Sequence, residues 1–170
     1  CRFLAEEGFA VGLSLDGPQP MHDRYRLTRD GQPTYGRTMR GYELLRRHHI
    51  DCDVLCVVSA HNVGHPIEVY RFFKQIGARY VSFLPLVEPQ SEATGGVSPR
   101  SVPAAAWGEF LCAIFDEWVK RDVGKTFVQI FDVTLGNWMG GPHAGGLCVF
   151  SEKCGTALAM EHNGDVYSCD

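Results

Sequence analysis

Short apolar runs alternate with helical patterns through the first two-thirds of the chain. The apolar runs predict buried strands, and they lie at 9–15, 51–59 and 79–87. The segments between them predict helices at 38–48 and 66–76. Strands and helices in alternation predict an α/β fold with a parallel sheet, whose buried strands are typically continuous apolar runs.

The next part of the chain carries the clearest helical pattern. Six apolar side chains recur at i, i+3, i+4, i+7, i+8 and i+11 from Trp107 to Trp118. Ser101 is a candidate N-cap for this helix, with Pro103 in its first turn. The run that follows, 126–135, predicts a further strand.

From Gly136 onward the chain changes character, because it becomes rich in glycine and then in cysteine. Near its end, Asn163-Gly164 separates two strand-like runs, which is a strong signal for a β-hairpin. We therefore expect an α/β domain over 1–135 and a small, cysteine-bearing β module over 136–170.

Composition narrows the class of protein. Of the 170 residues, 45% are hydrophobic and 21% are charged, which is ordinary for a soluble globular chain. The formal net charge is −4 and the basic residues are scattered, so neither a nucleic-acid surface nor a membrane patch is expected. Cys1 falls inside a helical pattern and Asp170 ends a strand-like run, so we expect an internal fragment of a longer protein.

The chain has seven cysteines and no secretory signal, which favours a reducing compartment, the cytoplasm. Cys52 and Cys56 lie on a predicted strand, where residues four apart are separated by about 13 Å. Both thiolates cannot bind one small cluster from there, and we expect them to be buried as small hydrophobes. Cys112 is likewise expected in or near the core.

Cys148, Cys154 and Cys169 are different, because the first two flank a short loop and the third ends the predicted hairpin. Thiolate ligands with one short and one longer spacing suit either an iron–sulfur cluster or zinc. Spacing alone leaves that choice open, and a fourth ligand is expected beyond Asp170.

Several motifs together resemble those of the anaerobic sulfatase-maturating enzymes, which are radical S-adenosylmethionine (radical-SAM) proteins with a SPASM domain. In order along the chain, the residues that carry the resemblance are Gly12-Leu13-Ser14-Leu15-Asp16-Gly17-Pro18, His22-Asp23-x2-Arg26, Phe83-x4-Glu88, Phe115-Asp116-x-Trp118, Cys148-x5-Cys154-x14-Cys169-Asp170 and Glu161-His162-Asn163-Gly164-Asp165-Val166-Tyr167-Ser168. The resemblance covers essentially the whole chain.

The resemblance implies the later half of a partial (β/α)6 barrel over 1–135 and the start of the SPASM module over 136–170. It implies roles for seven residues. S-adenosylmethionine would contact Ser14, Arg26 and Val87; the first auxiliary [4Fe–4S] cluster would be held by Cys148, Cys154 and Cys169; the general base would be Asp170. From local pattern alone, Ser14 is a turn residue, Arg26 could pair with Asp23 or Asp16, and His22 and Asp23 are surface or turn residues.

The family's activity is oxidation of a Cys or Ser in a sulfatase to formylglycine. The resemblance therefore implies [4Fe–4S] clusters and S-adenosylmethionine as cofactors. It implies a sulfatase polypeptide and a reductant such as a flavodoxin or ferredoxin as partners. The family's C-x3-C-x2-C loop is absent from this sequence, so the fragment alone is expected to be inactive.

Three alternatives stay open from the sequence. Another SPASM peptide maturase, forming thioether or carbon–carbon crosslinks, would share the barrel motifs. A zinc-stabilised, noncatalytic binding module would use the same cysteines without radical chemistry. A degenerate paralogue that only binds sulfatase peptides is the third.

Overall fold

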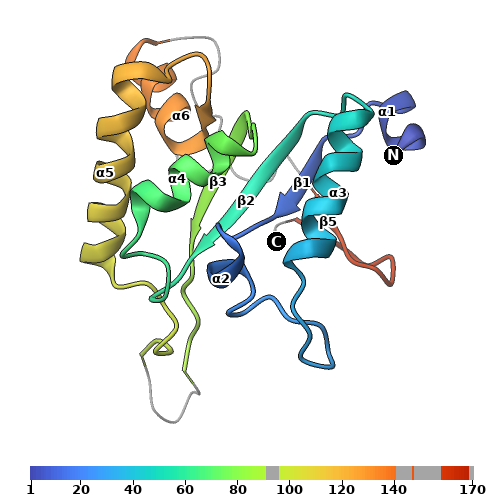
Figure 1. The fold of residues 1–170 in the computed structure, drawn as a ribbon, viewed down its shortest axis with the longest axis horizontal. Helices are drawn as coiled ribbons and strands as arrows, with labels where there is room; N and C mark the ends of the chain where they lie inside the picture. The colour runs from blue at the N-terminus through green and yellow to red at the C-terminus, as the bar shows by residue number, and fades with distance from the viewer. Residues whose placement is uncertain (91–95, 141–146, 148–157, 169–170) are drawn as a thin grey trace. The chain divides into compact units, whose positions relative to one another are not determined.

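The computed structural model describes residues 1–90, 96–140, 147 and 158–168 (Figure 1). Its elements in chain order are α1 (Arg2–Glu6), β1 (Val11–Ser14), α2 (Gln19–His22), α3 (Tyr35–Arg47), β2 (Cys52–Val58), α4 (Pro66–Gln75), β3 (Tyr80–Pro85), α5 (Ala104–Arg121), β4 (Phe127–Val128), α6 (Gln129–Trp138), β5 (Ala159–Met160) and β6 (Val166–Tyr167). The predicted α/β alternation is confirmed.

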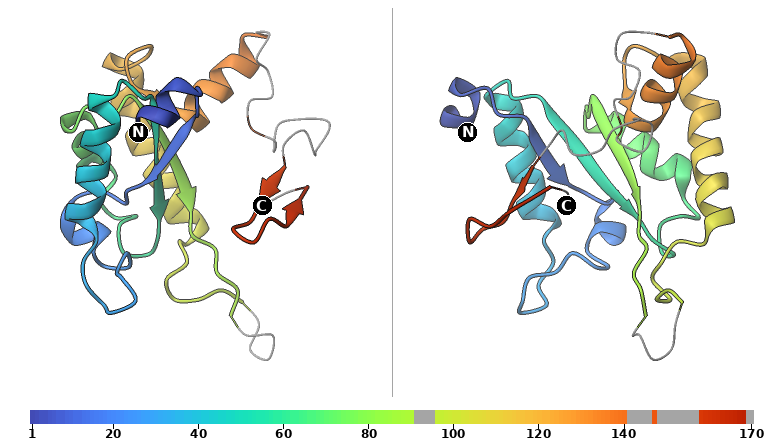
Figure 2. Two further views of the ribbon diagram at one scale, coloured as in Figure 1. Left: turned by 90° about the vertical axis from the view of Figure 1, so that its right-hand side faces the viewer. Right: turned by 180° about the vertical axis from the view of Figure 1, so that it is seen from behind.

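Strands β1 to β4 form one sheet in the order β1-β2-β3-β4, and every neighbouring pair is parallel. Register places Ser14 beside Leu55, and Leu55 beside Ser82. Strands β1, β2 and β3 therefore end toward the same edge of the sheet, whereas the short β4 pairs only with the start of β3. A crossover helix connects each pair of neighbours, and Figure 2 shows α3 and α4 on one side of the strands.

The face of the sheet that meets the helices forms the core. Along β2, buried residues alternate with half-buried ones, so that Cys52, Cys56 and their neighbours of the same parity point into the core. Phe83 on β3 meets Phe73 of α4 and Phe110 of α5, with ring centroids 6.2 and 5.3 Å apart. These contacts hold α4 and α5 against β3.

The opposite face of the sheet is less covered and more polar. Ser14, Leu55 and Ser82 share this face, because residues paired in register in a parallel sheet point to the same side. The Ser82 hydroxyl donates a 2.7 Å hydrogen bond to Asp53, which satisfies a buried polar group next to the open surface.

The chain divides into two compact units, Cys1–Gln129 and Ile130–Asp170. In the second, β5 and β6 pair antiparallel, which confirms the predicted hairpin. Gly164 donates its N–H to Glu161 and has φ +91°, so the glycine takes the left-handed position that closes a three-residue hairpin loop. The predicted boundary between 135 and 136 stays a prediction. No helix of the described residues is both long and apolar enough to cross a membrane.

The strand predicted at 126–135 is wrong. Only Phe127 and Val128 extend the sheet, and α6 begins at the next residue. Phe131, Leu135 and Trp138 have helical spacing, and Asp132 lies in the first turn, where a negative charge favours a helix. The run was predicted to be a strand because aromatic and β-branched residues favour strands, and its helical spacing was overlooked.

Two helix starts also differ from prediction. Helix α5 begins at Ala104 with Pro103 at the N-cap position, and Ser101 accepts the Glu88 N–H at 2.9 Å instead of capping the helix. Helix α3 begins at Tyr35, three residues early, because the Asp23 carboxylate accepts the N–H groups of Thr34 and Tyr35 at 3.0 and 2.9 Å. That cap comes from eleven residues away, where a local pattern gives no signal.

Candidate active site at the carboxyl ends of the strands

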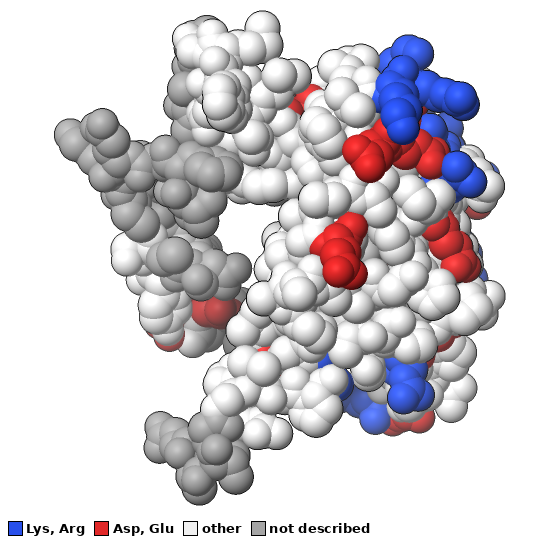
Figure 3. Space-filling model, turned by 90° about the vertical axis from the view of Figure 1, so that its left-hand side faces the viewer, with Lys and Arg blue, Asp and Glu red and all other residues white. Residues whose placement is uncertain are grey.

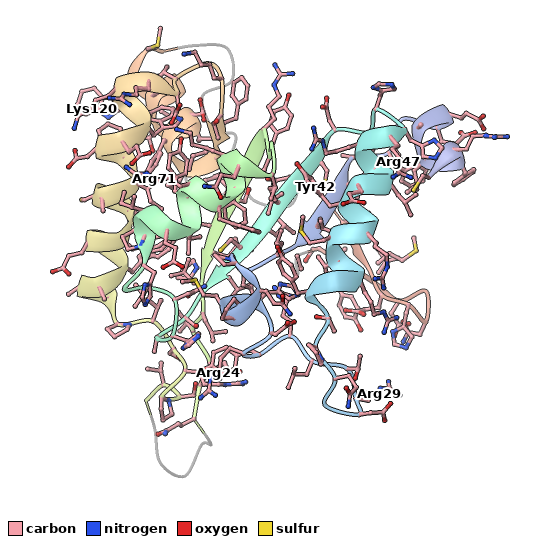
Figure 4. The ribbon with its side chains drawn as sticks, in the orientation of Figure 1. Arg24, Arg29, Tyr42, Arg47, Arg71 and Lys120 are labelled. Atoms are coloured by element: carbon pink, nitrogen blue, oxygen red, sulfur yellow. The ribbon has the colours of Figure 1, made fainter. Side chains whose placement is uncertain are left out.

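A cavity of about 200 Å³ lies where β1, β2 and β3 end. Its polar lining comes from the segments that follow these strands, and includes Asp16, Tyr25, Arg26, Asn62, Glu88 and Arg100. Parallel α/β folds place their binding sites at this edge, because the loops after the strands converge there. Figure 4 shows the labelled Arg24, next to Tyr25 in the chain, at this end of the sheet.

An ion pair forms the first wall of the cavity. Arg26 donates from Nε to Asp16 at 2.6 Å and from Nη2 at 3.1 Å. The same carboxylate accepts the Val57 N–H at 2.9 Å, so it is tied to the neighbouring strand. Asp16 is 7% exposed, whereas the Arg26 side chain is 30% exposed and reaches the cavity. Of the two partners left open for Arg26, the structure selects Asp16.

Asn62 joins the ends of β1 and β2 below this ion pair. Its amide donates to the carbonyl oxygens of Asp16 and Val57 at 3.2 and 3.0 Å, and its oxygen accepts the Ser59 N–H at 2.8 Å. Asn62 is 2% exposed, and its role could not be seen in the sequence because its partners are far away in the chain.

The expectation that His22 is a surface or turn residue is wrong, because its side chain is fully buried. The Asp16 N–H donates to Nδ1 at 3.3 Å, and Nε2 lies 3.0 Å from the Thr34 hydroxyl. That hydroxyl donates its proton to the Arg26 carbonyl at 2.6 Å, so it must accept from Nε2–H. His22 is therefore the neutral Nε2–H tautomer. Burial lowers its pKa, and Arg26 lowers it further, whereas Asp16 and Asp23 oppose the change.

A second ion pair also lines the cavity. Glu88 follows β3 and is paired with Arg100, and it also accepts a 2.7 Å hydrogen bond from Ser98. Hydrogen bonds from Ser98 and Arg100 lower the pKa of Glu88. The Arg100 guanidinium lies 5.5 Å from the centroid of the Tyr25 ring, which brings this loop against the loop that carries Arg26.

The other predicted S-adenosylmethionine contacts lie near the cavity without lining it. Ser14 is the last residue of β1, on the open face of the sheet, so its predicted position at a strand end is confirmed. Val87 lies two residues beyond β3 and is 64% exposed, between Leu86 and Glu88, which do line the cavity. The structure thus brings Arg26 into the cavity and leaves Ser14 and Val87 at its borders.

The cysteines divide by burial. Cys52 and Cys56 are buried, and burial raises the pKa of the Cys52 thiol to about 11 and that of Cys56 well above its usual value. Cys112 is exposed, so the expectation that it lies in or near the core is wrong. The predicted ligands Cys148, Cys154 and Cys169, and the predicted base Asp170, lie outside the described residues. Among the residues that are described, no three His, Cys, Asp or Glu side chains converge in a way that could hold a metal.

A second cavity, of about 310 Å³, lies between α4 and α5 on the outer surface. Arg71 and Glu117, which both line it, form an ion pair across the two helices at 2.8 Å, and Lys74 contacts Asp122 nearby at 2.6 Å. Figure 3 shows this side of the molecule, where basic and acidic side chains lie next to one another. We interpret it as a packing contact between helices.

No protein-family model matches the chain. A serine-type anaerobic sulfatase-maturating enzyme of Bacteroides thetaiotaomicron is 44% identical over 183 residues, which cover 100% of this chain and 44% of that protein. A cysteine-type anaerobic sulfatase-maturating enzyme of Clostridium perfringens is 30% identical over 171 residues, covering 99% of this chain and 45% of that protein.

The solved structures agree. Native anSMEcpe with bound AdoMet matches 99% of this chain and 46% of its own, with a TM-score of 0.79 and 28% identity. The parallel sheet and its cavity therefore define the class: an α/β chain with the fold of part of a radical-SAM barrel. Along its whole length the chain is homologous to the anaerobic sulfatase-maturating enzymes. It spans a little under half the length of the relatives that it matches.

Proposed function

We propose that this chain is part of an enzyme that oxidises a Ser or Cys in a sulfatase polypeptide to formylglycine, with S-adenosylmethionine and [4Fe–4S] clusters as cofactors. Homology along the entire chain to both serine-type and cysteine-type enzymes carries the proposal. The serine-type relatives have the higher identities, 44% and 35% against 30%, so a serine peptide belongs in the first assay.

The described residues fit the amino-acid end of S-adenosylmethionine. Asp16 occupies the Nε side of Arg26, which leaves the outer edge formed by Nη1 and Nη2 for a second carboxylate. Arg26 is one of the residues that line a cavity of about 200 Å³ at the carboxyl ends of the strands. Arg26 would bind the ligand's carboxylate, Ser14 would contact it from the end of β1, and Val87 would lie near the adenosine.

The remaining roles fall to residues of the second unit. Cys148, Cys154 and Cys169 would hold an auxiliary cluster, since thiolates are the usual ligands of iron–sulfur clusters. When bound, the clusters and S-adenosylmethionine supply the radical that removes hydrogen from carbon. Asp170 would accept the proton of the substrate's thiol or hydroxyl. A Ser hydroxyl is far less acidic than a thiol, so a positioned carboxylate matters more for serine.

Mass spectrometry of a sulfatase peptide tests this function. The full-length protein, reconstituted anaerobically with iron and sulfide, is incubated with reductant, S-adenosylmethionine and Cys-x-Pro-x-Arg or Ser-x-Pro-x-Arg peptides. We expect formylglycine in the peptide and 5′-deoxyadenosine in solution. Asp170→Asn should reduce formylglycine by about 10²-fold or more, the usual contribution of a general base, and reduce it most strongly for serine.

Asp165→Asn is the matched control, because Asp165 is an exposed carboxylate next to the hairpin loop that accepts a 2.7 Å hydrogen bond from the Asn163 amide. It should leave both products unchanged. Formation of 5′-deoxyadenosine without modified peptide would assign the protein to another class of radical-SAM peptide maturase.

A further inference from the structure

We propose that Asp16 is a positioning residue for ligand binding, and that it acts by turning the outer edge of Arg26 toward the cavity. The inference rests on the proposed function, because it takes the carboxylate of S-adenosylmethionine as the ligand of Arg26. Asp16 would not touch the ligand, but it would control whether Arg26 can bind it. A hydrogen-bond network that includes His22 and Thr34 holds Asp16 in place.

The geometry of the ion pair is the first observation. A guanidinium has five N–H donors, and Asp16 takes Nε–H and one Nη2–H at 2.6 and 3.1 Å. Three donors remain, and two of them, one on Nη1 and one on Nη2, form an outer fork that matches a carboxylate. Without Asp16, Arg26 would lose these two hydrogen bonds, and its side chain would be free to rotate so that the fork no longer faces the cavity.

The attachment of the carboxylate is the second observation. Its oxygen Oδ1 also accepts the Val57 N–H at 2.9 Å, and Asn62 holds the Asp16 carbonyl at 3.2 Å. Asp16 is therefore fixed to β2 and to the loop that follows it, and is 7% exposed. A mobile surface carboxylate would restrict the conformation of an arginine side chain only slightly. Asp16 is held in place by the sheet, so its hydrogen bonds restrict Arg26 to one orientation.

The backbone of both partners is tied together through the buried His22. The Asp16 N–H donates to Nδ1, Nε2–H donates to the Thr34 hydroxyl, and that hydroxyl donates to the Arg26 carbonyl, at 3.3, 3.0 and 2.6 Å. Asp16 and Arg26 are thus joined twice, by the hydrogen bonds between their side chains and by the hydrogen bonds that link their main chains through His22 and Thr34. Such a closed arrangement favours one rotamer of Arg26 over its alternatives.

The test compares two probes on the full-length, cluster-reconstituted protein: S-adenosylmethionine and decarboxylated S-adenosylmethionine, which lacks the carboxylate. The Kd of decarboxylated S-adenosylmethionine divided by the Kd of S-adenosylmethionine, both measured by calorimetry without reductant, reports carboxylate recognition. Asp16→Asn should lower this ratio by about tenfold, the range expected for a charge-assisted pair, and leave the Kd of the decarboxylated probe unchanged. Arg26→Lys should lower the ratio by a similar factor.

A double mutant of Asp16 and Arg26 distinguishes a positioning role of Asp16 from a general structural role. On the Arg26→Lys background, Asp16→Asn should have no further effect on the ratio, because both changes remove one interaction. Thr34→Val removes the hydroxyl that ties the Arg26 carbonyl to His22 and should lower the ratio in the same direction. It serves as the second variant if Asp16→Asn does not fold.

Glu117→Gln is the control, because it breaks a carboxylate–arginine pair of similar geometry with Arg71 between α4 and α5; Figure 4 labels Arg71 away from the strand ends. It should leave the ratio unchanged. If Asp16→Asn keeps the wild-type ratio, or weakens both probes equally, the positioning role is wrong while the proposed function stands. If wild type binds neither probe, the proposed function itself fails.

Discussion

The imidazole of His22 is buried behind the Asp16–Arg26 ion pair, in a place where only its neutral form fits. Protonation would add a hydrogen to Nδ1, which faces the N–H of Asp16 and must accept from it. The residue that the sequence assigned to a surface or turn therefore supports the structure of the candidate site. The local pattern could not show this, because the partners of His22 are six and twelve residues away.

Acid should weaken the fold through His22. Burial lowers the pKa of His22 below its usual 6.5, so the unfolded chain binds a proton that the folded chain resists. Stability is therefore complete above about pH 6.5 and falls as the pH drops from there to the folded-state pKa. His22→Asn should flatten this dependence in urea unfolding followed across that range. His48→Asn, which replaces an exposed histidine, should retain the wild-type dependence; an equally steep slope in His22→Asn would contradict this account.

Thiol labelling tests the assignment of the described cysteines. Cys52 and Cys56 are buried with raised pKa values, so little reactive thiolate is present at neutral pH. Iodoacetamide should modify Cys112 within minutes and leave Cys52 and Cys56 unmodified until the protein unfolds, as read by peptide mass spectrometry. Rapid modification of Cys56 in folded protein would show that β2 is not buried as described.

At the scale of helices and strands, the spacing of apolar residues along the chain predicted most of the fold. The strands at 51–59 and 79–87 and the helix at 66–76 were confirmed to within two residues at each end. The prediction failed where β4 passes into α6, because a run of aromatic and β-branched residues suits either structure and the helical period was overlooked. It also failed at the start of α3, which Asp23 caps from a distance in the chain.

The cap of α3 gives a prediction at this scale. Asp23 accepts two N–H groups at the start of the helix, and loss of such a cap typically costs about 1 kcal/mol. Asp23→Ala should therefore speed hydrogen exchange of the Thr34 and Tyr35 amides roughly fivefold. Asp30→Ala, which replaces an exposed carboxylate of the same loop, should leave their exchange unchanged. Equal protection in both variants would rule out the cap.

At the scale of the whole molecule, the motifs identified the family before the fold was known, and homology along the full chain confirmed it. The candidate site was predictable only in part. Arg26 was found by resemblance, but Asp16, His22 and Asn62 acquire their roles through contacts that the fold creates. For the predicted ligands Cys148, Cys154 and Cys169, spacing left the choice open between an iron–sulfur cluster and zinc.

Iron content settles that choice. Changing Cys148, Cys154 and Cys169 together to Ala should remove one cluster's iron from the full-length protein and lower its broad absorbance near 400 nm, as the proposed cluster requires. Cys112→Ala, at an exposed thiol on α5, should change neither quantity. Loss of zinc with unchanged iron in the triple variant would favour the zinc-stabilised module.

The most direct test of the proposed oxidation to formylglycine follows a deuterium atom from the substrate peptide. The full-length, reconstituted protein is given S-adenosylmethionine, reductant and a sulfatase peptide deuterated at the β-carbon of its target Ser or Cys. The account predicts that deuterium appears in 5′-deoxyadenosine while the peptide gains formylglycine. 5′-Deoxyadenosine without deuterium, or no 5′-deoxyadenosine from protein that holds its clusters, would contradict it.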